Sequence, residues 1–112
     1  MRAAGVKACP GSTTRVTVQH EGRRYRIERS PGVAAGTVRE VWPGRGVIGS
    51  QRPWLGDRHA ARPSWYAAVN PTARPYGALA YQERLPSRRA AIRWLLTTSA
   101  TLGLPREEAP DA

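Results

Sequence analysis

The sequence predicts an α+β fold, in which a small antiparallel β-sheet of three to five strands is backed by one C-terminal α-helix. Three observations lead to this prediction. Residues 15–28 alternate between polar and apolar side chains on both sides of a two-residue turn, which is typical of a half-buried hairpin. Short apolar runs bounded by Pro and Gly follow. Residues 91–102 then carry apolar side chains at helical spacing.

The hairpin is the first element, and Glu21 and Gly22 separate its two strands. This pair suits a two-residue turn that requires positive φ angles. If His20 pairs with Arg23, all the apolar residues of both strands fall on one side of the sheet. That side carries Val16, Val18, Tyr25 and Ile27. The opposite side carries Arg15, Thr17, Gln19, Arg24, Arg26 and Glu28.

Three later segments are predicted to extend the sheet. Residues 37–42 (TVREVW) form a third strand, residues 65–69 (WYAAV) a buried strand, and residues 77–81 (GALAY) the strand that returns beside it. The interval 43–64 is rich in Gly, Pro and Arg. It is predicted as a long loop, with at most a short extended piece at Val47 and Ile48.

One segment has the pattern of an amphipathic helix. Ser87 is a favourable N-cap, and Gly103 followed by Pro105 ends the helix. The apolar stripe between these signals consists of Ala91, Ile92, Leu95, Leu96 and Leu102. A single domain is therefore predicted over residues 14–104, which suits a chain of 112 residues. A flexible lead at 1–13 precedes it, and an acidic tail at 105–112 follows it.

The charge of the chain indicates the class of its partner. There are 18 Lys and Arg residues against 8 Asp and Glu residues, a formal net charge of +10, and only Lys7 is not arginine among the cations. A GC-rich genome explains the preference for arginine over lysine, but it does not explain the excess of cations over acids. Long-range attraction of this kind favours polyanions, above all nucleic acid.

Other classes of function find little support in the sequence. The single Cys9 excludes an internal disulfide and a multi-cysteine zinc site. Residues 44–49 (GRGVIG) match the dinucleotide-binding pattern GxGxxG, but Pro53 prevents the long helix that this mechanism requires. His59 near Asp57 is the only close pair of groups suited to acid–base chemistry. We therefore predict no catalytic residues, no metal site and no cofactor.

The sequence also predicts where the protein is found. No window is apolar for long enough to span a membrane, and the first residues lack the apolar core of a signal peptide. We therefore expect a cytoplasmic protein with no membrane partner. The oligomeric state stays open.

The hairpin arginines Arg15, Arg24 and Arg26 are the strongest candidates for a functional surface. A two-stranded ribbon fits the major groove of DNA, and guanidinium groups bind phosphates with paired hydrogen bonds. Arg39, Arg45 and Arg52 are expected to support them. Trp42 and Trp54 either stack on unpaired bases or cover a thin core.

A stretch near the C-terminal end resembles known DNA-binding domains. Residues 65–96 read WYAAV, a turn with Arg74, GAL, and then SRRAAIRWLL. This order resembles the DNA-binding domain of plant ethylene-response factors and the arm-site-binding domain of tyrosine recombinases. The resemblance implies a three-stranded sheet in the major groove of double-stranded DNA, with arginines of the sheet on the DNA and Ile92, Leu95 and Leu96 packed behind it.

The sequence thus predicts a non-catalytic nucleic-acid-binding protein, with DNA favoured over RNA. A second hypothesis has the same basis in composition. Arginine and tryptophan are frequent anchors of protein interfaces, so the alternative is a small adaptor or inhibitor that binds an acidic protein surface, which composition does not separate from the first hypothesis. An accessory protein of a mobile genetic element is one example.

Overall fold

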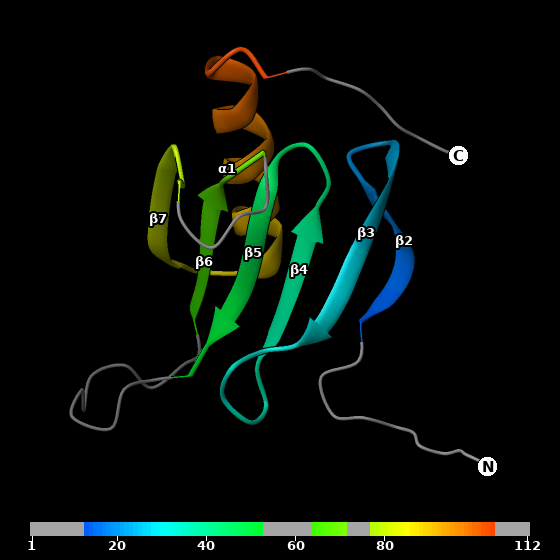
Figure 1. Cartoon of the computed structure of the whole chain (residues 1–112), viewed down its shortest axis with the longest axis vertical. Coiled ribbons are helices and arrows are strands. Elements are labelled where there is room, and N and C mark those ends of the chain that lie inside the picture. Colours follow the sequence, from blue (N-terminus) through cyan, green and yellow to red (C-terminus); the bar gives the residue numbers. More distant parts are fainter. Residues whose placement is uncertain (1–12, 53–63, 72–76, 105–112) are drawn as a thin grey trace.

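The computed structural model describes residues 13–52, 64–71 and 77–104 of the chain. In these residues one antiparallel sheet is followed by one helix (Figure 1). The elements are β2 (Thr14–His20), β3 (Arg23–Pro31), β4 (Val38–Trp42), β5 (Gly46–Gln51), β6 (Ser64–Val69), β7 (Ala80–Leu85) and α1 (Arg88–Thr101). The α+β class with one C-terminal helix is confirmed. The predicted three to five strands are wrong, because the described sheet has six, and they lie side by side in chain order.

The hairpin of β2 and β3 has the predicted register. His20 pairs with Arg23, and Val18 faces Tyr25. Glu21 and Gly22 have φ angles of 51° and 81°, as a two-residue turn with positive φ at both positions requires. The alternation of side chains therefore separates an apolar side, which packs against the core, from a polar side.

Strand β5 lies inside the interval that the sequence predicts as a loop. It spans six residues and pairs along its full length with β6, so that Val47 faces Ala68 and Ile48 faces Ala67. Gly46 has a φ of 155°, and a Cβ atom there would overlap the backbone oxygen of Ala68. Gly46 therefore permits a close approach of the two strands, which the composition of residues 43–64 does not reveal. The predicted loop positions 53–63 lie outside the described residues.

The last strand is displaced from its predicted position. Residues 77–79 precede β7, which runs from Ala80 to Leu85. The pairing of β6 with β7 shifts register between Trp65 and Ala67. Arg84 has a φ of 64° in this irregular part, which is typical of a β-bulge.

Helix α1 covers one face of the sheet and closes the core. It contacts chiefly β5 and β6 and lies behind them in Figure 1. Its predicted N-cap is confirmed, because the Ser87 side chain accepts a hydrogen bond from the backbone of Ala90 at 3.1 Å. The buried core consists of Ile27, Trp42, Ile48, Ala67, Val69, Ala91, Ile92 and Leu95.

A buried carboxylate joins the start of α1 to the middle of the sheet. Glu40 on β4 has no exposed surface. Its Oε2 atom accepts hydrogen bonds from Arg29 Nη2 at 3.0 Å and from Arg88 Nε at 2.7 Å. A second contact, from Arg93 Nη2 to Glu21 Oε2 at 3.1 Å, joins α1 to the hairpin turn. Both contacts join α1 to the face of the sheet that the helix covers, and no other helix occurs in the described residues.

The ends of the chain fall largely outside the described part. The predicted lead at 1–13, apart from Thr13, and the predicted acidic tail at 105–112 are not among the described residues. Within the described ranges, no helix has the length and apolarity that a membrane crossing requires.

Candidate nucleic-acid interface

Four arginines lie on the face of the sheet that α1 leaves open. Strand alternation places Arg15 of β2, Arg24 and Arg26 of β3, and Arg39 of β4 on this face. All four are exposed. We call them the arginine face. The structure therefore brings together the three hairpin arginines and Arg39, which is one of the three arginines that the sequence analysis expected to support them.

Glu28 is the acidic residue that lies opposite Arg15 on the arginine face. Glu28 is opposite Arg15, but the closest atoms, Arg15 Nε and Glu28 Oε2, are 3.9 Å apart and the Arg15 side chain is 88% exposed. An exposed pair of this kind contributes about 1 kcal/mol at most. Glu21 and Glu40 are engaged by Arg93 and by Arg29 and Arg88. The long contact with Glu28 therefore leaves the Arg15 side chain largely exposed on the arginine face.

A shallow depression lies along the hairpin next to this face. Its volume is about 470 Å³, and its lining includes Arg15, Thr17, Arg26 and Pro43. It forms because β3 pairs with β4 only from Glu28 onward, so the first half of β3 separates from β4. A phosphate group placed there would meet the guanidinium groups of Arg15 and Arg26 and also the carboxylate of Glu28, which lines the same depression.

Two tyrosines extend the open face beyond the arginines. The rings of Tyr66 on β6 and Tyr81 on β7 have centroids 6.3 Å apart and planes inclined by 31°. Tyr81 is 53% exposed and Tyr66 is half-buried. A Cβ atom at Gly49 would lie 2.5 Å from the Tyr66 hydroxyl oxygen, so the ring lies flat over this glycine. Gly49 pairs with both Arg39 and Tyr66, which places an arginine and an aromatic ring in one row.

Both tyrosine hydroxyls keep their protons at neutral pH. Burial raises the pKa of Tyr66 above its ordinary value, although the positive charge of Arg39 lowers it in part. Burial also raises the pKa of Tyr81, and the neighbouring Glu83 raises it further. The two rings therefore add no negative charge to a surface that would meet a polyanion, and their faces can stack on bases.

The sequence analysis missed these tyrosines because it treated residues 65–69 as wholly buried. A period-two signal was present, since the buried Ala67 and Val69 alternate with Tyr66 and Ala68. Alternation within the strand places Tyr66 on the face opposite the core.

The other candidate residues do not join this face. The Arg45 guanidinium lies 5.6 Å from the centroid of the Tyr25 ring, on the side of the sheet that carries α1. Arg52 Nη1 donates to the Ala35 carbonyl at 3.0 Å beside the connection between β3 and β4. Trp42 is 1% exposed and packs in the core with Tyr25, at a centroid distance of 5.1 Å. It covers the core and cannot stack on bases, whereas Trp54 lies outside the described residues.

In the described ranges His20 Nε2 lies 3.6 Å from Glu21 Oε2, and burial lowers the pKa of His20. No three His, Cys, Asp or Glu side chains of residues 13–52, 64–71 and 77–104 gather in a way that could hold a metal ion. The pair of His59 and Asp57 falls outside those ranges. No protein-family model, curated protein or solved structure matches the chain. The resemblance to plant and recombinase DNA-binding domains therefore stays a prediction.

Proposed function

We propose that the protein binds nucleic acid without catalysis, DNA in preference to RNA, and that the arginine face contacts the phosphates. The observation that carries this proposal is the position of Arg15, Arg24, Arg26 and Arg39 on the face of the sheet opposite α1. Guanidinium groups donate paired hydrogen bonds to phosphate oxygens. The overall charge of +10 attracts the polyanion before these contacts form.

Several features support DNA as the partner. The hairpin of β2 and β3 is a two-stranded ribbon of the width that enters the major groove. The open face is formed by adjacent strands, and no helix of the described part lies over it. Phosphate contacts position a protein on DNA, and base contacts from Arg24 or Arg26 would then provide sequence preference.

The salt dependence of binding by the intact protein tests this proposal. Four phosphate contacts predict that the logarithm of the association constant falls with the logarithm of salt concentration at a slope of about −3.6. Affinity for a duplex then drops about 150-fold between 50 and 200 mM salt. Fluorescence anisotropy with a labelled 20-base-pair duplex measures this slope. Absence of binding at the lower salt concentration would contradict the proposal and favour an acidic protein partner.

The tyrosines predict a second, separable effect. Replacing Tyr81 with alanine should weaken binding of a single-stranded oligonucleotide about tenfold, because one stacking contact to a base contributes about 1–3 kcal/mol. Duplex binding should change little, since paired bases are already stacked on each other. Anisotropy titrations of Y81A with both labelled probes measure the two affinities.

The conservative variant Tyr81→Phe is the control for this prediction. It keeps the ring and loses only the hydroxyl group, so single-strand affinity should stay close to that of the wild type. An equal loss of affinity in Y81F and Y81A would show that the ring face is not what binds.

A further inference from the structure

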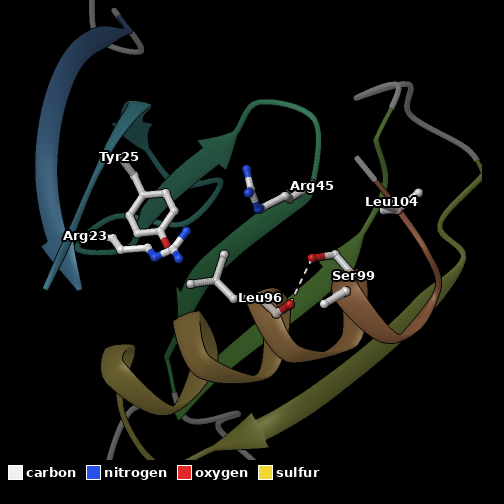
Figure 2. Close-up of a pocket in the computed structure, with 7 residues that line it drawn as sticks. Arg23, Tyr25, Arg45, Leu96, Ser99 and Leu104 are labelled. Atoms are coloured by element: carbon white, nitrogen blue, oxygen red, sulfur yellow. Dashed lines mark hydrogen bonds between the residues drawn. The ribbon is translucent and has the colours of Figure 1, made fainter. Parts of the chain in front are cut away.

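A second concave site lies on the other side of β3, away from the arginine face. Its volume is about 260 Å³, and Figure 2 shows it between the hairpin, the connection of β4 with β5, and the last turns of α1. The residues that line it are Arg23, Tyr25, Arg45, Leu96, Ser99, Ala100 and Leu104. We call it the helix-side pocket. It has a polar side, formed by two arginines, and an apolar side, formed chiefly by aliphatic residues near the end of α1.

Strand alternation separates this pocket from the proposed DNA surface. Arg23 and Tyr25 point to the side of β3 that carries α1, whereas Arg24 and Arg26 point to the open side. Neighbouring residues of one strand therefore serve two surfaces of the molecule. The pocket exists because residues 23–27 of β3 have no pairing partner on β4, which leaves space between the hairpin and the connection that follows β4.

The backbone holds Arg45 firmly in place. Its N–H donates to the Trp42 carbonyl at 2.9 Å, and its carbonyl accepts from the Asn70 N–H at 2.8 Å. The guanidinium group lies over the Tyr25 ring at 5.6 Å, a cation–π arrangement that restricts the side chain further. The pocket thus has one preorganised cation, which lowers the entropic cost of binding an anion.

Among the described residues that line the pocket there is no carboxylate to balance its two arginines. In the part of the chain that the structure describes, Glu21 is engaged by Arg93, and Glu40 by Arg29 and Arg88. Neither Arg23 nor Arg45 forms an ion pair with any of the described acids. Two neighbouring guanidinium groups that pair with none of the described acids are suited to bind a phosphate or a carboxylate.

We propose that the helix-side pocket binds a small organic anion. Its phosphate or carboxylate group lies between Arg23 and Arg45, where the Tyr25 hydroxyl can also donate a hydrogen bond. Its apolar body packs on Leu96, Ala100 and Leu104. The volume is below the range of about 300–1,000 Å³ that holds drug-sized ligands, so the ligand is a short-chain acid or phosphate monoester. This site is independent of the proposed function, because it uses the opposite face of the sheet.

Titration of the full-length ¹⁵N-labelled protein with hexyl phosphate tests this proposal. We expect saturable changes in the amide resonances of Arg23, Arg45 and Ala100. Hexanol should cause none, and inorganic phosphate should bind at least tenfold more weakly because it lacks the apolar body. Hexanoate in a parallel titration distinguishes a carboxylate from a phosphate ligand. Absence of saturation with both hexyl phosphate and hexanoate would overturn the proposal.

Two matched double variants separate the pocket from the arginine face. Arg23→Gln with Arg45→Gln should weaken binding of the preferred probe at least tenfold. Arg24→Gln with Arg26→Gln removes the same charge from the opposite face and should leave that binding unchanged. Equal losses in the two variants would overturn a defined pocket in favour of unspecific attraction. DNA binding of the two double variants is a separate test, because it is expected to depend on Arg24 and Arg26 and not on Arg23 and Arg45.

The acidic residues Glu107 and Glu108 follow Leu104 closely in the chain and supply the remaining control. The titration is repeated with the double variant Glu107→Gln and Glu108→Gln, and we expect the affinity for the probe to stay within about twofold, because the proposed contacts come from Arg23 and Arg45. Binding that is seen only in this variant would overturn the proposal, because these residues of the chain would then be the occupant.

Discussion

Replacing Arg24 and Arg26 with alanine is expected to lower duplex affinity about thirtyfold at 50 mM salt and to reduce the salt slope from about −3.6 to about −1.8. The two substitutions remove two charged side chains from the exposed side of the hairpin. For each arginine that is removed, one phosphate keeps its condensed counter-ion, so fewer counter-ions are released when the protein binds DNA. Anisotropy titrations of R24A/R26A at several salt concentrations measure both quantities.

The control for this variant removes the same charge from the opposite side of the sheet. Arg23→Ala with Arg45→Ala lowers the net charge equally but leaves the arginine face intact. Its duplex affinity should fall by no more than about threefold, since only long-range attraction is lost. If both double variants lose affinity equally, net charge and not the arginine face causes binding. Thermal unfolding of R24A/R26A should stay close to that of the wild type, because exposed side chains contribute little to stability.

The hairpin and the helix were predictable because their signals are local. In the hairpin, a slip by one residue would move Val18 to the exposed side, so the alternating pattern admits one register. In the helix, Ser87 and Gly103 mark the ends, and the apolar stripe between them has the helical period. Strand β5 lacked such a signal. Its Gly46 and Gly49 disfavour a strand locally, and only pairing with β6 and packing of Tyr66 over Gly49 give them a place in the sheet.

The part of the candidate site that depends on local alternation was predictable, and the part that depends on contacts between distant segments was not. Alternation along a strand placed Arg15, Arg24 and Arg26 on one face, and the pairing of β4 with β3 placed Arg39 beside them. The direction of Arg45 was not predictable, since it depends on how the connection after β4 contacts Tyr25 and Asn70. Trp42 is buried because β4 turns it toward the core, which follows only from the register of the whole sheet.

The buried Glu40 should matter more for stability than any residue of the arginine face. Replacing it with glutamine is expected to lower the free energy of unfolding by about 3 kcal/mol. An amide group has only one acceptor oxygen, so its NH₂ group would face a guanidinium donor without a partner. Arg29 and Arg88 keep 43% and 35% of their side-chain surface exposed, so water compensates part of the loss. Urea unfolding of E40Q followed by circular dichroism measures the change.

Glu28→Gln is the matched control for this prediction, because it makes the same chemical change on the open face. Glu28 is 41% exposed and lies 3.9 Å from Arg15, so its loss should change the free energy of unfolding by less than about 0.5 kcal/mol. A loss below about 1 kcal/mol in E40Q would show that the bridge from β4 to α1 is dispensable. A loss of about 3 kcal/mol would show that the buried carboxylate of β4 contributes to holding α1 on the sheet, beside the apolar contacts of Ile92 and Leu95.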